Sequence, residues 1–296
     1  MKHIVTSILL LNCYLLYAQT APVASNATVT TNEDTDYSGM LSASDVDGDS
    51  LTYSVLTSPS NGSLSTFSSS YGSLSFDGVD DYVDLTSSNV AIQGNNPRTI
   101  SAWIKTGDND FRLVSTGTAE GSQAFNLVVI DGIVGVMGHA NDFYPSNGTA
   151  IDDDQWHHVS ASYTTGELKI YVDGNLDNST LVNDDGDSLI YNTTGQNNFI
   201  GKSNHDCCPM YYQGLIDEVA IWNSALTAAE VTAMYNSGKG LSAATNSGNY
   251  TSSNDLVAYW KMNEGTGTSL ADASSNSNTG TINGATWSTD SPIDIN

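Results

Sequence analysis

Residues 155–174 read "QWHHVSASYTTGELKIYVDG" and contain two runs of alternating apolar and polar side chains around a Gly-containing segment. In the second run Leu168, Ile170 and Val172 point to one side of a strand, and the residues between them point to the other. The segment "TTGEL" between the runs has the composition of a tight turn. The stretch therefore predicts a β-hairpin with one apolar face.

Short alternating runs of the same kind recur before and after this hairpin, separated by Gly, Asp and Asn turns. This spacing is typical of an antiparallel β-sandwich. The runs are "SLSFDGVDDYVDL" at 73–85, "RTISAWIKTG" at 98–107, "FRLVSTGT" at 111–118, "FNLVVIDGIVGVMGH" at 125–139, "NNFIGKS" at 197–203 and "QGLIDEVAIW" at 213–222.

One segment, "SALTAAEVTAMYNSG" at 224–238, interrupts the strands with a helical pattern. Thr227 and Glu230 have the spacing of a capping box, and Gly238 suits the C-terminal cap. Val231 lies on the face expected to point inward. We therefore expect one short structural helix after the last strand of the sandwich.

The charge of the chain is strongly negative. Eight Lys and Arg residues stand against 33 Asp and Glu, for a formal net charge of −25 at pH 7. Such a chain repels nucleic acid and anionic membranes, attracts divalent cations, and holds an acidic polymer only through a bridging metal. Most of the acids lie in turns rich in Gly, Ser and Asn, where a solvated surface accounts for them.

The first residues, 1–18, read "MKHIVTSILLLNCYLLYA" and have the layout of a secretory signal peptide. The apolar run is too short to span a bilayer, and no later segment is long and apolar enough. "LLNC" resembles a lipoprotein box, but Asn12 and the apolar residues after Cys13 favour export without a lipid. We expect a secreted protein, extracellular or at the cell surface, that does not insert into the membrane.

Two adjacent cysteines, Cys207 and Cys208, remain after the signal peptide is removed, and they work in an oxidising compartment. Neighbouring Cα atoms are about 3.8 Å apart, below the roughly 4.4 Å at which disulfides usually begin. The two thiols bond to each other under strain, pair with another chain, or stay free. We favour the bond between neighbours, since a stiff loop would present Tyr211 and Tyr212 with less entropy to lose on binding.

Several of these motifs together carry a family resemblance. "SLSFDGVDDYVDL", "TISAWIKT", the 155–174 hairpin and "GLIDEVAIWNSALTAAEV" resemble a laminin-G-like domain of the concanavalin A-like lectin/glucanase superfamily. The resemblance implies an all-β fold, an antiparallel jelly-roll β-sandwich with one short C-terminal helix. It also implies frequent structural Ca²⁺ and binding of glycans or proteins. The fold does not fix the function, because the superfamily includes both lectins and glycanases.

The segment before this domain resembles the opening of cadherin-like, immunoglobulin-type repeats. It includes the acidic turn "DVDGD" at 45–49, which either binds Ca²⁺ or is solvated. The expected order is a signal peptide at 1–18, a partial cadherin-like segment at 19–66, a laminin-G-like domain at 67–240, a linker at 241–255 and a C-terminal segment at 256–296.

The C-terminal stretch 256–287, "LVAYWKMNEGTGTSLADASSNSNTGTINGATW", resembles the segment that precedes "SFDGVDDYV" in this family, although here it follows the domain. Two hypotheses account for it. Either it folds back and supplies edge strands, as in a circular permutation, or it begins a truncated second copy. Exposed apolar edges are a liability, which favours folding back.

A calcium site is expected near the turn "FDGVDDY", because Ca²⁺ prefers carboxylate, carbonyl and amide oxygens. The resemblance places the last core strand near this turn, and a folded-back tail adds further ligands. The alternative is a solvated turn, with the strand carboxylate capping backbone amides. The candidate ligands are Asp77, Asp80, Asp81, Asp217, Asp272 and Asn278.

Aromatic side chains in the loops are candidates for glycan binding, because sugar rings stack on aromatic faces while polar neighbours form hydrogen bonds. Since strand neighbours alternate, one member of each aromatic pair is expected in the core. Trp103, Trp156 and Trp222 are assigned to packing. The candidates are Phe143, Tyr144, Tyr211 and Tyr212, with Asp142, His205 and Asp206 as polar partners.

No catalytic motif stands out. Glycoside hydrolysis needs two carboxyl groups that flank one bond, whereas Asp217 and Glu218 are strand neighbours expected on opposite faces. The same alternation separates His157 from His158 and argues against a two-His metal site. We predict a non-catalytic module that binds a glycan or polysaccharide. The alternatives are a surface adhesion protein that binds protein partners, and a divergent polysaccharide-degrading enzyme.

Overall fold

The computed structural model of the protein describes residues 23–24, 43–44, 72–177, 180–182, 189–205 and 209–292. The chain forms two compact units, Met1–Ser69 and Ser70–Asn296. In the first unit, β1 (Val23–Ala24) pairs in antiparallel fashion with β2 (Ala43–Ser44). The expected signal peptide and the acidic turn at 45–49 lie outside the described residues.

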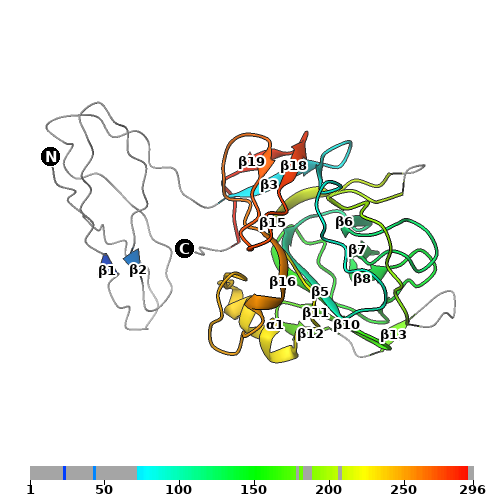
Figure 1. Ribbon diagram of the computed structural model, residues 1–296. Helices are drawn as coiled ribbons and strands as arrows, with labels where there is room; N and C mark the ends of the chain where they lie inside the picture. Colours follow the sequence, from blue (N-terminus) through cyan, green and yellow to red (C-terminus); the bar gives the residue numbers. More distant parts are fainter. Residues whose placement is uncertain are drawn as a thin grey trace, which may run out of the picture. The chain divides into compact units, whose positions relative to one another are not determined.

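The second unit is built from two antiparallel sheets (Figure 1). The larger sheet has the order β12 (Asn175–Leu176), β11 (Glu167–Val172), β10 (Trp156–Thr164), β5 (Arg98–Lys105), β15 (Gln213–Trp222), β3 (Ser73–Asp77) and β19 (Thr286–Ser288), with β16 (Leu256–Trp260) also beside β15. The smaller sheet has the order β17 (Ser269–Leu270), β18 (Gly280–Asn283), β4 (Tyr82–Asp84), β14 (Phe199–Ile200), β6 (Phe111–Ser115), β7 (Asn126–Ile130) and β8 (Ile133–Met137). A separate pair joins β9 (Tyr144–Pro145) to β13 (Leu181–Val182).

The main core lies between the two sheets. Ile104 and Ile216 from the larger sheet and Val83, Val129 and Ile200 from the smaller one are all buried in it. Alternation supplies one inward side chain from every second residue, so each strand contributes to this layer. The antiparallel sandwich predicted from the alternating runs is confirmed.

The 155–174 hairpin is formed by β10 and β11. Thr164 faces Glu167 across the ladder, which leaves a two-residue turn ending at Gly166. Gly166 has a φ of 78°, a left-handed conformation that favours glycine. Ile170 points into the main core as expected, while Tyr171 points to the other face and is buried there as well.

The predicted helix is α1 (Ala228–Tyr235), and its start is as expected. The Thr227 side chain accepts from the Glu230 backbone N–H, and the Glu230 carboxylate accepts from the Thr227 N–H at 3.0 Å, which completes the capping box. The helix ends earlier than predicted. Asn236, with a φ of 50°, forms the C-terminal cap in place of Gly238, because Asn also tolerates the left-handed conformation.

The α1 side of the larger sheet carries a second apolar cluster that includes Trp222 and Tyr259. The segment 241–255 belongs to this cluster, so its assignment as a linker is wrong. Ala243 and Tyr250 are fully buried, and the Tyr250 hydroxyl donates to the Ala243 carbonyl at 2.7 Å and accepts from Trp222 Nε1 at 2.9 Å. None of the helices in the described part of the chain has the length and apolar character needed to cross a membrane.

The C-terminal segment contributes strands to both sheets. β16 pairs with the second half of β15, β18 pairs with β4, and β19 pairs with β3 (Figure 1). Trp260, Met262 and Ile282 from this segment are buried in the main core. These strands occupy the places that the fold-back hypothesis gives to the tail, and β16 lies beside the longest strand of its sheet.

Candidate functional site

The acidic turn, residues 77–81, connects β3 to β4. Gly78 adopts a φ of 79°, and Asp77 Oδ1 accepts the Val79 N–H at 2.8 Å, so the turn folds back tightly. Asp81 Oδ2 accepts the Asp77 N–H at 2.9 Å. As a result, carboxylate oxygens of Asp77, Asp80 and Asp81 lie within 4.8 Å of one another.

The electrostatics of the acidic turn favour a cation. Burial raises the pKa of Asp81; the Asp77 N–H opposes this rise, and the charges of Asp77 and Asp80 add to it. Asp77 and Asp80 are exposed and Asp81 is buried. Three converging carboxylates beside solvent suit a hard ion such as Ca²⁺, which takes water and carbonyl oxygens for its other ligands.

The outer aromatic patch, formed by Tyr82, Phe199, Lys202 and Tyr211, begins next to this turn. Tyr82 directly follows the turn, and its ring meets that of Phe199 edge-on with centroids 5.8 Å apart. Lys202 Nζ lies 4.5 Å from the centroid of each ring. The ammonium group is thus held over two aromatic rings by cation–π attraction.

The alternation of the strands places this patch on the outer face of the smaller sheet. Ile200 points into the core, so its neighbour Phe199 points away from it. Tyr211 lies directly opposite Lys202 in an antiparallel bridge, and Tyr211 points outward because Tyr212 points inward. Opposite residues of an antiparallel pair share a face, which brings Tyr211 to the side of Lys202.

Sequence reasoning identified Tyr211 and the three acids but missed Tyr82, Phe199 and Lys202. The alternation in "FDGVDDYVDL" and "NNFIGKS" is the signal that could have placed Tyr82 and Phe199 away from the core. What could not be seen is that β4 and β14 are paired, since Phe199 lies more than one hundred residues along the chain from Tyr82.

Two of the predicted aromatic ligands are packed in the core, which corrects their assignment. Tyr212 is 0% exposed, and its hydroxyl donates to the Leu215 and Lys105 carbonyls at 2.9 and 3.0 Å. Phe143 is 9% exposed and belongs to the main core. Neither ring has a face open to a sugar. The expectation that one member of each pair packs inward therefore holds for both pairs.

The remaining members of those pairs are half-buried. Tyr144 lies in β9, beyond β8 and at the opposite side of the smaller sheet from β4. Asp142 accepts the Gly138 N–H at 2.9 Å and so holds its own loop. The structure therefore does not bring Tyr144 or Asp142 into the outer aromatic patch.

His205 belongs to a loop network with His139, Asn204 and Asn126. The two imidazole rings lie 5.8 Å apart, and His139 Nε2 lies 3.0 Å from Asn204 Oδ1. Buried Asn126 donates to the same Asn204 oxygen at 3.1 Å. This network fixes the start of the loop that continues to Cys207 and Cys208; Asp206 and both cysteines lie outside the described residues.

Three of the six predicted calcium ligands do not join the acidic turn. Asp217 accepts from the Glu218 N–H and from Ser291 Oγ, and Asp272 accepts the Tyr259 and Asn278 N–H groups. Asn278 Nδ2 donates to the Val257 carbonyl at 2.8 Å. Their polar groups are already used to hold loops and the tail. The structure therefore does not bring Asp217, Asp272 or Asn278 into the cluster of carboxylates at the acidic turn.

A β-bulge at Asp217 and Glu218 also corrects the prediction that these carboxylates face opposite sides. The register with β5 shifts between Asp217 and Ala220, and Glu218 has a left-handed φ of 52°. Val219 points into the main core, and Ala220 lies in the cluster on the α1 side. The extra residue leaves Asp217 and Glu218 together on the side away from the main core.

The environment of this acid pair strongly favours protonated carboxyls. Burial raises the pKa of Glu218 to about 8, opposed by a hydrogen bond from the Tyr259 hydroxyl and by the charge of Lys261. Burial, and then the charge of Glu218, raises the pKa of Asp217 well above its ordinary value. Asp217 is 1% exposed and bonded to Ser291, so the tail encloses the pair.

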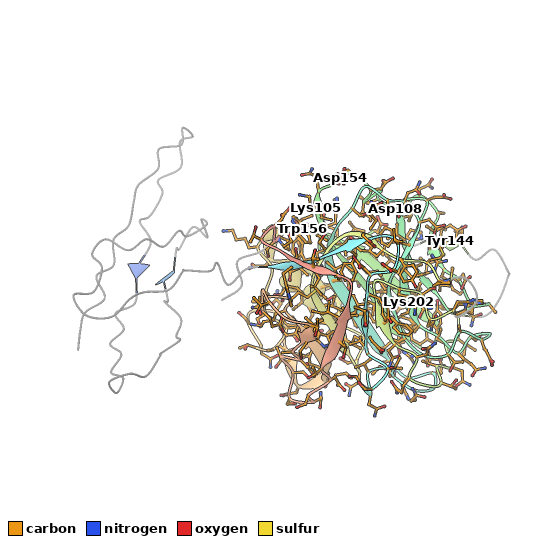
Figure 2. All side chains as sticks on the ribbon, turned by 90° about the horizontal axis from the view of Figure 1, so that it is seen from above. Lys105, Asp108, Tyr144, Asp154, Trp156 and Lys202 are labelled. Carbon is orange, nitrogen blue, oxygen red and sulfur yellow. The ribbon has the colours of Figure 1, made fainter. Side chains whose placement is uncertain are left out.

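The adjacent histidines and the tryptophans serve mainly in packing, as expected. His157 lies between Asp173 and Asp153, at 2.9 and 3.2 Å, while His158 packs on Trp103 at 5.4 Å. Trp103 and Trp222 are buried. Trp156, by contrast, is half-buried and lies next to Lys105 (Figure 2). Its Nε1 donates to Asp290, which also pairs with Lys105.

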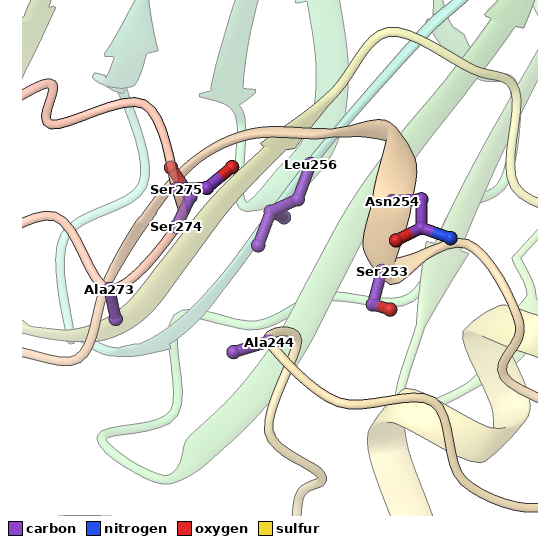
Figure 3. A pocket seen from close by; sticks show the side chains of 7 residues that line it. All are labelled: Ala244, Ser253, Asn254, Leu256, Ala273, Ser274 and Ser275. Atoms are coloured by element: carbon purple, nitrogen blue, oxygen red, sulfur yellow. The ribbon is translucent and has the colours of Figure 1, made fainter.

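A small pocket of about 180 Å³ lies between the segment after α1 and the tail (Figure 3). Its lining consists of small and polar side chains and one leucine, without an aromatic or titratable group. It therefore offers neither a stacking surface nor an acid and base. The lining residues are Ala244, Ser253, Asn254, Leu256, Ala273, Ser274 and Ser275.

Comparison with protein families gives two matches. The model of the concanavalin A-like lectin/glucanases superfamily matches residues 77–232, just over half of the chain. The chain belongs to this superfamily. The model of a bacterial Ig domain matches residues 19–105, which supports the immunoglobulin-type resemblance of the N-terminal segment and overlaps the first match. Comparison with curated proteins gives no match.

Solved structures of the superfamily fold resemble the chain. A Bacteroides ovatus protein to which carbohydrate binding has been attributed aligns with a TM-score of 0.53 and 19% identity, over 83% of this chain and 69% of its own. At that identity the likeness shows the fold alone. The sialyllactose-bound carbohydrate-binding domain of a Ruminococcus gnavus sialidase aligns with a TM-score of 0.42 and 18% identity, over 56% of this chain and 98% of its own.

Proposed function

We propose that this protein is an exported, non-catalytic module that binds a glycan on the outer face of its smaller sheet. The outer aromatic patch carries the proposal, because strand pairing brings aromatic rings and Lys202 together on the outer face of the smaller sheet. Sugar rings present C–H faces that pack on aromatic rings. The superfamily and the fold shared with the Bacteroides ovatus protein support the same function.

We further propose that the acidic turn binds Ca²⁺ and thereby stiffens this face. Asp81 immediately precedes Tyr82, and Asn283 faces Tyr82 from β18. An ion held by Asp77, Asp80 and Asp81 would fix the start of β4. Calcium would then support binding indirectly, by ordering the Tyr82 ring on which the sugar packs.

A glycan array probed with the full chain in calcium tests the proposal. Binding is expected to fall about tenfold or more in Tyr211→Ala and in Tyr82→Ala, since each removes a stacking surface. Tyr144→Ala is the matched control, because Tyr144 lies at the other side of the sheet. If only Tyr144→Ala loses binding, the ligand binds at the other side of the smaller sheet, near Tyr144.

A second candidate is a polysaccharide-degrading enzyme, which the acid pair at the β-bulge favours. A Glu218 carboxyl with a pKa of about 8 holds a proton at neutral pH, as a general acid must. Chromatography of polysaccharides incubated with the full chain and with Glu218→Gln decides this. Cleavage that disappears in Glu218→Gln would make the protein an enzyme.

A third candidate is a surface adhesion protein, favoured by the bacterial Ig match at residues 19–105. Such modules support export and surface display, which also suits glycan binding outside the cell. Binding to whole cells that survives enzymatic removal of their glycans would favour a protein partner over a glycan.

A further inference from the structure

Lys202, like Arg98 and Lys261, lies over aromatic rings and forms no ion pair with a described carboxylate. Lys105, Arg112 and Lys169 each pair with a carboxylate at 2.8 to 3.1 Å. Within the described residues Lys202 has no carboxylate at ion-pairing distance, although Asp and Glu outnumber Lys and Arg about fourfold. Its Nζ instead lies over the rings of Tyr82 and Phe199.

Within the described part of the chain, the rings hold the charge of Lys202 in place, and the N–H groups of its ammonium donate no hydrogen bond. Cation–π attraction acts on the charge, whereas an ammonium group has three N–H donors for oxygen acceptors. The backbone also positions this side chain. Gly201 has a left-handed φ of 77°, and a Cβ at Gly201 would come within 2.6 Å of the Phe76 ring. Glycine therefore permits the turn that brings Lys202 over the patch.

We propose that the outer aromatic patch selects acidic glycans, with Lys202 pairing with a carboxylate or sulfate on the sugar while Tyr211 packs against its ring. This rests on the proposed function and names the class of glycan. A charge-assisted hydrogen bond from an ammonium is about twice as strong as a neutral one. A hydroxyl of a neutral sugar can accept a hydrogen bond from the ammonium, but only an anionic group adds attraction between opposite charges.

The net charge of −25 opposes an acidic ligand, and the acidic turn lies at the edge of the same patch. Long-range repulsion of this kind slows association and weakens binding. A cation in the acidic turn would remove the nearest part of this repulsion. Binding of an acidic glycan is therefore expected to strengthen with Ca²⁺.

The test uses titration calorimetry of the full chain with matched polymer pairs. Alginate, polygalacturonate and hyaluronate are each compared with their carboxyl-reduced forms, and a sulfated galactan with its desulfated form. We expect the acidic member of at least one pair to bind about tenfold tighter than its neutral partner. The carboxylated and sulfated pairs show which anion Lys202 prefers.

Variants then assign the preference to one residue. Lys202→Gln is expected to reduce the tenfold preference to about onefold, because binding of the acidic form falls more than binding of the neutral form, and Lys202→Arg is expected to retain most of the preference. Unchanged melting temperatures serve as the folding control. Equal binding of acidic and neutral forms, or a preference that persists in Lys202→Gln, would overturn the inference while leaving glycan binding intact. Absence of binding to every polymer would contradict glycan binding as well.

Discussion

Glu218 shows how one backbone irregularity changes the surroundings of a side chain. Period-two alternation places Asp217 and Glu218 on opposite faces, but the left-handed φ of Glu218 inserts an extra residue and keeps both on one side. A bulge depends on the pairing with β5, which the sequence of β15 alone does not contain. Alternation therefore predicted the strand correctly and the position of this pair incorrectly.

The raised pKa of Glu218 has a consequence for stability. Its folded pKa of about 8 exceeds its ordinary value of 4.5, so the folded protein binds the proton more tightly than the unfolded chain. The contribution of Glu218 to the stability of the fold is therefore greatest below pH 4.5. It falls as the pH rises from 4.5 to 8, and Asp217 acts in the same direction.

Glu218→Gln is expected to raise the melting temperature at pH 8 and to leave it nearly unchanged at pH 4.5. Each pKa unit corresponds to about 1.4 kcal/mol, so a gain of roughly 1–3 kcal/mol at pH 8 is reasonable. Glutamine can still accept from the Tyr259 hydroxyl. Melting curves of both proteins between pH 4.5 and pH 8 give the measurement. If the melting temperatures of the two proteins change with pH in the same way, folding does not raise the pKa of Glu218.

Arg98 is a buried cation held entirely by neutral oxygens. Its guanidinium donates to the carbonyls of Ile92, Gly94 and Asn96 and to Thr193 Oγ1, at 2.5 to 2.9 Å. Burial lowers its pKa to about 10, so it remains charged at neutral pH. The planar guanidinium reaches several acceptors at once, which a lysine ammonium cannot do.

Arg98→Lys is therefore expected to destabilise the fold by roughly 2–4 kcal/mol, because buried carbonyls lose their donors. The control is Arg112→Lys, whose ion pair with the exposed carboxylate of Asp110 is worth roughly 0–1 kcal/mol. Chemical denaturation of both variants makes the comparison. Equal losses would show that the network around Arg98 contributes little.

At the scale of elements, the sequence predicted correctly those features that depend on residues close together in the chain. The 155–174 hairpin has its turn at Gly166, and the capping box starts α1, because both depend on residues a few positions apart. The end of α1 at Asn236 and the packing of 241–255 were missed. The packing of 241–255 depends on contacts with the larger sheet that no local pattern records. Asn236 and Gly238 both adopt a left-handed φ, so the local pattern did not decide which of them ends α1.

The tail provides the sharpest prediction for an element. A chain that ends at residue 245 would lose several buried core side chains together with the partner strand of β15. Removal of each large core side chain costs roughly 2–5 kcal/mol, so the shortened chain is expected not to unfold cooperatively. The side chains lost are Ala258, Trp260, Met262, Leu270, Ile282 and Ala285.

Calorimetry of this shortened chain, compared with one that ends at residue 292, makes the measurement. The longer control keeps every described strand and is expected to melt like the full chain. If the chain ending at 245 instead melts cooperatively at the full-chain temperature, the C-terminal strands are not part of the sandwich.

At the scale of the whole molecule, one part of the candidate site could be predicted from the sequence and the other part could not. Of the six predicted calcium ligands, the three that are close in sequence, Asp77, Asp80 and Asp81, lie together in the acidic turn. Of the aromatic patch only Tyr211 was predicted, because Tyr82 and Phe199 meet through the pairing of β4 with β14. A site assembled across strands becomes visible only once the register is known.

Calcium binding at the acidic turn predicts a dependence of folding on the ion. A ligand at about 100 times its Kd stabilises the fold by roughly 2.7 kcal/mol, or roughly 5–10 °C for a domain of this size. The melting temperature is expected to fall by that amount in a chelator. Asp80→Asn should abolish the response, while Asp272→Asn, outside the turn, should retain it. An unchanged midpoint would exclude a stabilising ion.

The proposed function requires that the outer face of the smaller sheet binds a sugar and leaves it intact. Titration calorimetry of the full chain in calcium with the oligosaccharide selected on the array, followed by chromatography of the recovered ligand, tests this most directly. We predict saturable binding that is lost in Tyr82→Ala and Tyr211→Ala, with the oligosaccharide recovered at its original length. Shortened oligosaccharides, or binding that both variants retain, would contradict the account.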